Sequence, residues 1–206
     1  MTASNGARPG PVGPLDTPKS ESVTEQGQPD GWVPPAGFVR ELESGAGTTR
    51  VAVSVPHTHL LDLHVALART LAEPVSVLYR QLIDRRDPKP QGSPPRDFVA
   101  VDQRLDRVIA GIEAHTSLLH HDARCELWLR GSMGEQLVLD ADGMLFCYPD
   151  DPAFGDVLGE HGLDADVPET IADRNFVKHW FHAENDAVED AFVRALQLTE
   201  VPARGR

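Results

Sequence analysis

The histidines are the residues of this chain whose type and spacing come closest to a chemical site. Nine occur in 206 residues, and the densest group is Pro56-His57-Thr58-His59. That group follows an apolar strand and precedes a helix, the end of a sheet where ligand sites of α/β proteins form. A second group contains His179, His182 and Glu184. Imidazoles and carboxylates are common transition-metal ligands, so the two groups would form a metal site if they met in space.

The spacing within these groups argues against that metal site. Paired ligands on one helix are normally three or four residues apart, whereas His57 and His59 are two apart. A catalytic zinc site also needs second-shell groups that orient each imidazole, and the sequence offers no obvious ones. We therefore expect neither a bound metal nor another cofactor. A metal-dependent hydrolase built on the two groups stays the alternative hypothesis.

Three further segments contain residues that could carry chemistry, but each has a simpler structural explanation. Asp140-Ala141-Asp142-Gly143 lacks the spacing of a calcium loop and indicates a hairpin turn. Gly131-Ser132-Met133-Gly134 joins two predicted strands, whereas a phosphate-binding loop leads into a helix. Cys125 and Cys147 lie in predicted strands, and we expect both to be free thiols. No catalytic residue is identified, which favours a protein that is not an enzyme.

Trp128 and Arg130 are the candidate binding residues. They are two positions apart in a predicted strand, so they share one face of the sheet. If that face is exposed to solvent, both are residue types that anchor protein interfaces. The alternative is that Trp128 packs beneath a helix.

Hydrophobic periodicity predicts the elements that position these residues. Strands are expected over 50–55, 75–83, 125–130, 136–139, 144–148 and 175–181, and helices over 59–72, 100–119, 152–161 and 184–198. The first strand, helix and strand should form a right-handed crossover with parallel strands. The order β-α-β-α-β-β-β-α-β-α predicts an α+β fold, a mixed sheet with helices packed mainly on one face.

The hairpin at Asp142-Gly143 gives the most specific prediction of register. A two-residue turn would pair Leu139 with Phe146 and Leu137 with Tyr148, and the hydrophobic pattern would place all four on the core face.

Composition divides the chain into a tail and a domain. Residues 1–48 contain seven prolines, eight glycines and few large apolar residues, so we expect them to be disordered or loosely docked. Residues 49–200 should form one α+β domain, and residues 201–206 a frayed C-terminus.

Charge and cysteine usage limit the function. A net charge of −13 argues against nucleic acids and anionic membranes as partners. The sequence has no signal-peptide pattern and no apolar run of membrane-spanning length, which predicts a cytoplasmic protein. The leading hypothesis is a non-catalytic module that binds or regulates another protein. A small-ligand sensor, with a pocket between sheet and helices, is a third possibility, and the oligomeric state stays open.

Overall fold

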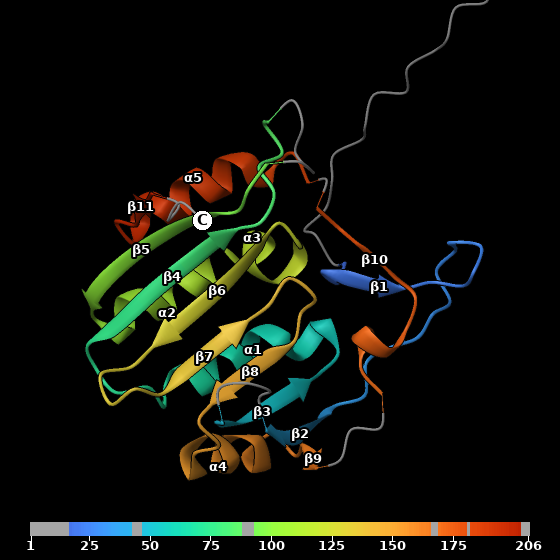
Figure 1. Ribbon diagram of the computed structural model, residues 1–206, viewed down its shortest axis with the longest axis horizontal. Helices are drawn as coiled ribbons and strands as arrows, with labels where there is room; N and C mark the ends of the chain where they lie inside the picture. Colours follow the sequence, from blue (N-terminus) through green and yellow to red (C-terminus); the bar gives the residue numbers. More distant parts are fainter. Residues whose placement is uncertain (1–16, 43–46, 88–92, 166–168, 181, 203–206) are drawn as a thin grey trace, which may run out of the picture.

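The chain folds around one large sheet with helices against it (Figure 1). The computed structural model describes residues 17–42, 47–87, 93–165, 169–180 and 182–202. Within these ranges lie a nine-stranded sheet, a two-stranded sheet, five α-helices and a short 3-10 helix. The predicted α+β class, with a mixed sheet and packed helices, is confirmed.

The large sheet is antiparallel except at one edge, where β2 and β9 pair in parallel. In spatial order its strands are β11 (Thr199–Val201), β5 (Arg96–Gln103), β4 (Val75–Gln81), β6 (Cys125–Arg130), β7 (Gln136–Leu139), β8 (Leu145–Tyr148), β3 (Thr49–Ser54), β2 (Gly37–Leu42) and β9 (Asp164–Ala165). The meander β6-β7-β8 pairs strands that are consecutive along the chain. The other neighbours, apart from β2-β3 and β4-β5, are distant in sequence.

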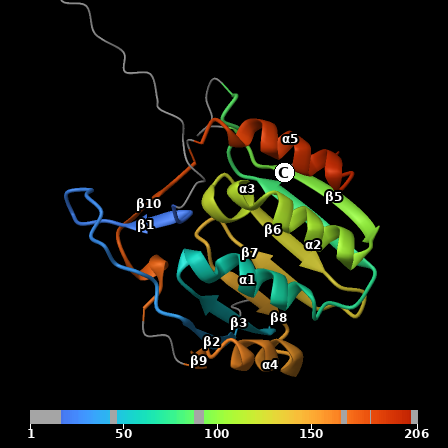
Figure 2. The ribbon, with the colours of Figure 1, turned by 180° about the vertical axis from the view of Figure 1, so that it is seen from behind.

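The helices lie on one side of this sheet (Figures 1 and 2). They are α1 (His57–Ala68), α2 (Leu105–Ala114), α3 (Thr116–His121), α4 (Pro152–Glu160) and α5 (Asn185–Ala195). The best-defined start is that of α4. There the Asp151 carboxylate accepts the amide hydrogen of Ala153 at 2.8 Å, and Pro152 occupies the first turn, where no amide donor is needed.

Burial alternates along the central strands, which shows how the sheet uses its two faces. Along β4, Val75, Val77 and Tyr79 are at most 1% exposed and contact the helices, whereas Ser76 and Leu78 are half-buried on the other side. This is the period of two that an extended strand imposes. The hydrophobic core therefore lies between one face of the sheet and the helical layer.

A short N-terminal segment packs across one end of the sheet. β1 (Ser20–Ser22) pairs antiparallel with β10 (Phe176–Lys178), and we call residues 17–22 the strap. The Lys19 side chain is buried, and its ammonium donates to the carbonyl oxygen of Cys125 at 2.9 Å. The Ser20 hydroxyl donates to the Asp142 carboxylate at 2.8 Å. The strap is therefore held by specific polar contacts to the meander.

The structure corrects the expected tail over residues 1–48. Residues 20–22 and 37–42 form strands, so the folded part begins well before residue 49; residues 1–16 and 43–46 lie outside the described residues. The composition was misleading because β1 has its strand partner more than 150 residues away. At the other end, Val201 completes β11, and residues 203–206 lie outside the described part.

Two predictions about element order were wrong. Strands β3 and β4 are not a parallel pair, because β6, β7 and β8 lie between them. The helix expected over 100–119 begins at Leu105, and residues 96–103 form β5 instead. The expected helix reaches too far towards the N-terminus because apolar residues of β5 continue into the helical pattern of α2.

The turn of the β7–β8 hairpin contains three residues instead of two. The Asp140 amide donates to the Met144 carbonyl oxygen at 3.0 Å, which leaves residues 141–143 as the loop. Gly143 has a φ of +84°, the left-handed conformation typical of the last residue in such a three-residue loop.

The extra residue changes which side chains of β8 reach the core. Leu137 and Leu139 pair with Cys147 and Leu145, one residue away from the expected partners. These four side chains are fully buried beneath the helices. Phe146, which we expected in the core, lies on the opposite face with the other aromatic residue of β8.

Candidate functional site

The face of the large sheet opposite the helices carries one continuous row of apolar side chains. Cross-strand pairing aligns one residue from each of seven strands: Val99, Leu78, Trp128, Val138, Phe146, Ala52 and Val39. We call these seven residues the apolar row and this side of the sheet the open face. Six strand spacings of about 4.8 Å make the row about 29 Å long. None of the described helices crosses the open face in Figures 1 and 2.

Trp128, one of the two predicted binding residues, lies at the β6 position of this row, beside Leu78 of β4. It is half-buried, whereas the next residue, Leu129, is fully buried beneath the helices. Its indole N–H donates to the Glu126 carboxylate at 3.0 Å, which fixes the ring on the sheet. The alternative position beneath a helix is therefore not the one observed.

Beside Trp128 the open face is hollowed between β5, β4 and β6. The hollow has a volume of about 190 Å³, and its apolar lining includes Leu78, Val99 and Val101. Val101 is 64% exposed, unusual for a valine in a strand. Arg130, the other predicted binding residue, also lines the hollow; its side chain is exposed and makes no ion pair or hydrogen bond with any residue that the structure describes. The two sequence candidates thus belong to one concave, largely apolar surface.

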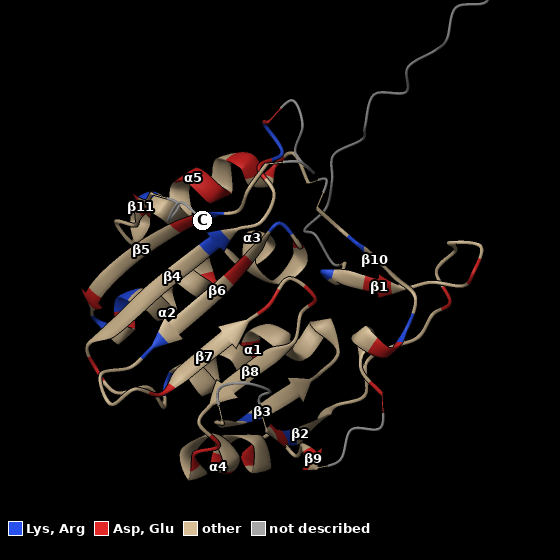
Figure 3. Ribbon diagram, viewed as in Figure 1, with Lys and Arg blue, Asp and Glu red and all other residues tan. Residues whose placement is uncertain are grey.

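Charged residues lie on both sides of the apolar row. On one side Arg80 forms an ion pair with Asp97 at 2.8 Å; this bond raises the pKa of Arg80 and lowers the pKa of Asp97. Glu126 lies on that same side, two residues before Trp128, and Arg130 lies two residues after it. Figure 3 shows the negative charge near the start of β6 and the positive charge at its end.

The other end of the row is covered by side chains of the sheet itself. The Arg50 guanidinium stacks on the Phe146 ring, 4.6 Å from its centroid. It also donates to Glu41 at 2.8 Å and to the Tyr148 hydroxyl at 3.1 Å. The β7 residue of the row, Val138, is also buried, so the accessible part of the apolar row is its β5–β6 end, which contains the hollow.

The histidine groups expected as weak metal candidates do not form a common centre. His59 and Glu184 are exposed on different helix starts, whereas His57 contacts His121 with ring centroids 6.2 Å apart. His179 lies 3.3 Å from Glu21 of the strap.

The remaining candidate, His182, takes part in the fold through its backbone, because its carbonyl oxygen accepts a hydrogen bond from Arg124. Within the described ranges, no three His, Cys, Asp or Glu side chains are grouped as a metal site requires. The expectation that the protein binds no metal stays a prediction.

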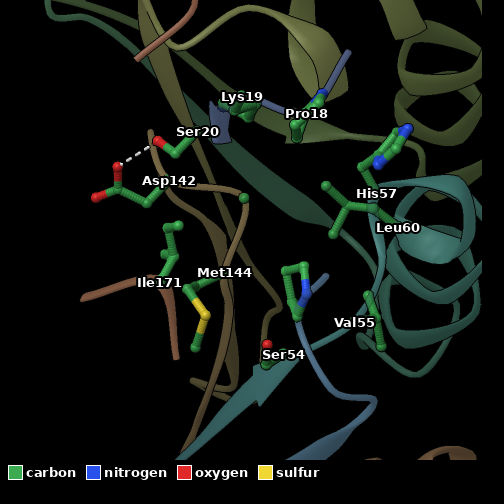
Figure 4. A pocket seen from close by; sticks show the side chains of 12 residues that line it. Pro18, Lys19, Ser20, Ser54, Val55, His57, Leu60, Asp142, Met144 and Ile171 are labelled. Carbon is green, nitrogen blue, oxygen red and sulfur yellow. Dashed lines mark hydrogen bonds between the residues drawn. The ribbon is translucent and has the colours of Figure 1, made fainter. Parts of the chain in front are cut away.

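His57 does line a small cavity between the strap and the meander (Figure 4). Ser20 and Asp142, joined by their hydrogen bond, lie on one side of it, and Leu60 and Met144 close it. Its volume is about 20 Å³, room for about one water molecule and too little for an organic ligand.

Sequence reasoning missed a buried pair of histidines near the strap. His64 Nδ1 and His120 Nε2 are 3.0 Å apart, and both side chains are almost fully buried. Burial lowers the pKa of His64 to about 3, with a smaller effect from the positive charge of Lys19, and burial likewise lowers the pKa of His120. Both rings are therefore neutral at pH 7. The signal was present, because His64 follows Leu60 by four residues on the apolar stripe of α1.

A buried ion network was missed as well. The Arg124 guanidinium is fully buried and lies 2.9 Å from Asp122, 2.8 Å from Asp186 and 3.6 Å from Glu189. Glu189 also accepts a hydrogen bond from the buried Tyr79 hydroxyl at 2.5 Å, while burial raises the pKa of this carboxyl. The network ties α5 to β4 and to the start of β6, and its partners satisfy one another, so it is a structural feature.

The two cysteines are free and buried, as expected, on strands separated by β7. Burial raises the pKa of Cys125 to about 11 and that of Cys147 to about 12, so neither is a reactive thiolate at neutral pH.

Comparison with known proteins does not assign this chain to a family. Among the described residues, no helix is both long and apolar enough to cross a membrane. No known protein family, curated protein or solved structure was found to match this chain.

Proposed function

We propose that this chain is a non-catalytic binding module that takes up a protein partner on the open face of its large sheet. The observation that carries the proposal is the apolar row, accessible around Trp128 and hollowed beside it. An exposed apolar surface with a polar border is typical of an interaction site, since it costs solubility unless it is used. Trp and Arg are the residue types enriched among the strongest anchors of protein interfaces.

The composition of the hollow supports binding over catalysis. Its polar lining residues are Ser76, Arg130 and Gln136. An arginine stays protonated at physiological pH, and neither a serine nor a glutamine without an adjacent base transfers protons readily. The hollow thus offers apolar contact, one cation and two neutral hydrogen-bonding groups, which suits recognition of another protein surface.

Two exposed valines provide a matched test. Val101 lines the hollow, whereas Val177 is 40% exposed on β10, in the small sheet. The tagged full chain and its Val101→Asp and Val177→Asp variants would be used to capture partners from lysate of the native cell. Quantitative mass spectrometry should find a stoichiometric protein with the wild type and with Val177→Asp, and at least a roughly tenfold loss with Val101→Asp.

Thermal unfolding of the three proteins controls for folding, because both substitutions are at exposed sites and should leave the transition similar. Equal capture by Val101→Asp and wild type would contradict the proposal, as would the absence of any stoichiometric protein.

A further inference from the structure

We propose that the partner on the open face is a second copy of this chain, bound through a two-fold axis that runs along the apolar row. This inference rests on the proposed function and names its partner. It starts from β6, where the open face reads Glu126, Trp128, Arg130: an acid, an aromatic anchor and a base at successive outward positions. Such an order is complementary to itself when a second copy is laid over it in the opposite direction.

Symmetry decides which charges meet. Two identical faces can be stacked by a two-fold axis lying in the plane between them. An axis parallel to the strands and directly over β6 would place Glu126 on Glu126 of the second copy and Arg130 on Arg130. An axis along the apolar row reverses the strand direction, so that Glu126 of each copy faces Arg130 of the other. Of these two axes through the position of β6, only the one along the apolar row brings opposite charges together, and it does so twice.

The same axis also superimposes the apolar rows. Trp128 then meets Trp128, and Leu78 meets Leu78, so that the half-buried side chains of both copies leave water together. Stacked sheets pack about 10 Å apart with nearly aligned strands, a spacing that these side chains fill. Arg80 and Asp97 also lie on the open face. They neutralise each other within each copy, so this pair brings no uncompensated charge to the interface.

The lack of a partner for Arg130 fits this arrangement. The other arginines of the open face, Arg80 and Arg50, each have a carboxylate at 2.8 Å in their own chain. Arg130 has none among the described residues, although the chain as a whole carries a net charge of −13. Across the proposed interface it gains Glu126 of the other copy, whose carboxylate is already held by the Trp128 indole.

Mixing two single variants tests this geometry. Glu126→Arg puts arginine against arginine at both contacts of a homodimer, and Arg130→Glu puts glutamate against glutamate. Sedimentation equilibrium over the micromolar range should find the wild type as a dimer and each variant alone at least roughly tenfold weaker in self-association.

An equimolar mixture of the two variants should recover a dimer. In the mixed dimer, the arginine introduced at position 126 of one copy faces the glutamate introduced at position 130 of the other. The second contact is the native one between Glu126 and Arg130, so both contacts join opposite charges.

Recovery in the mixture cannot be explained by damage to the fold, because two damaged proteins would not repair each other. Val177→Asp serves as the charge control and should dimerise like the wild type. A wild type that stays monomeric, or a mixture that stays as weak as its components, overturns the two-fold arrangement. The capture experiment with Val101→Asp still decides the proposed function in that event, because it detects any protein bound at the hollow.

Discussion

The two faces of the large sheet are made by the same strands, yet one is buried beneath the helices and the other is partly exposed to solvent. Along β6, Leu127 and Leu129 are at most 1% exposed beneath the helices, whereas Trp128 and Arg130 alternate with them on the open face. Successive side chains along the strand thus alternate between the buried face and the open face. The covered face provides the hydrophobic free energy of folding, and the open face keeps apolar area that the monomer has not used.

Charge follows the same division. Arg124 is fully buried among three carboxylates near the covered face, while Arg80 forms a pair with Asp97 on the open face, where both side chains are 36% exposed. A buried charge must be paired, because removing one partner leaves the others uncompensated in a medium of low polarity. An exposed pair is hydrated before and after it forms, so its loss matters little.

Replacing each of these arginines with leucine should give the largest contrast. We expect Arg124→Leu to lower the free energy of unfolding by about 3–5 kcal/mol, since the buried Asp122 would lose its cation and the buried Glu189 would keep only Arg86, 3.4 Å away. Arg80→Leu should cost less than about 1 kcal/mol. Urea titration at pH 7 measures both values. Equal losses would mean that the network around Arg124 is hydrated and that the two regions do not differ as described.

Truncating neighbours on β6 compares the two faces directly. Leu129→Ala should lower the free energy of unfolding by about 2–5 kcal/mol, because it leaves a cavity in the core. Trp128→Ala removes a larger side chain but should cost less than about half as much in the monomer, since that side chain is only half-buried. Urea titration at a concentration below self-association is the measurement. A Trp128→Ala loss as large as that of Leu129→Ala would show that Trp128 belongs to the folding core.

Acid should weaken the covered face through its histidines. The pKa of His64 is about 3 in the folded protein and 6.5 as a free side chain, so the unfolded chain binds the proton more readily. The stabilising effect of the neutral ring is complete above pH 6.5 and is lost as the pH falls from 6.5 towards 3, by about 1.4 kcal/mol per unit of pH. Urea titration at several pH values should therefore show that the free energy of unfolding falls less in acid for a His64→Leu, His120→Leu double variant than for the wild type.

His59→Leu provides the control for that pH dependence, because His59 is exposed on the same helix. It should leave the slope between pH 6.5 and pH 3 unchanged. An identical slope in the double variant would instead show that the buried pair is protonated without cost.

The meander and the helical layer could be predicted because their signals are local. The alternation in residues 125–130, the Asp151-Pro152 start of α4 and the positive φ of Gly143 all depend on a few neighbouring residues. The strands β1 and β11 could not, because each has three residues and pairs with a distant segment. No local pattern separates such a strand from a loop.

The candidate site was predicted in part for the same reason. Trp128 and Arg130 could be assigned to one face from their spacing alone, since the period of a strand is two. Leu78 and Val99 complete the surface only because β4 and β5 lie beside β6, and strand order is not encoded locally. The predicted turn was one residue shorter than the observed turn at residues 141–143. The prediction therefore placed Phe146 in the core instead of in the apolar row, because a slip of one residue exchanges the faces of a whole strand.

The short outermost strands of the large sheet have a consequence for aggregation. The described part of β9 is two residues long, and β11, at the opposite edge, is three residues long. A sheet edge grows into a fibril by offering a long row of free amide and carbonyl groups as a template, and these edges offer very few. Backbone pairing along β9 and β11 themselves is therefore a poor route to unwanted polymers, whereas residues 39–42 of β2 and 100–103 of β5 pair with no described strand on their outer side and are the stretches where such growth would begin.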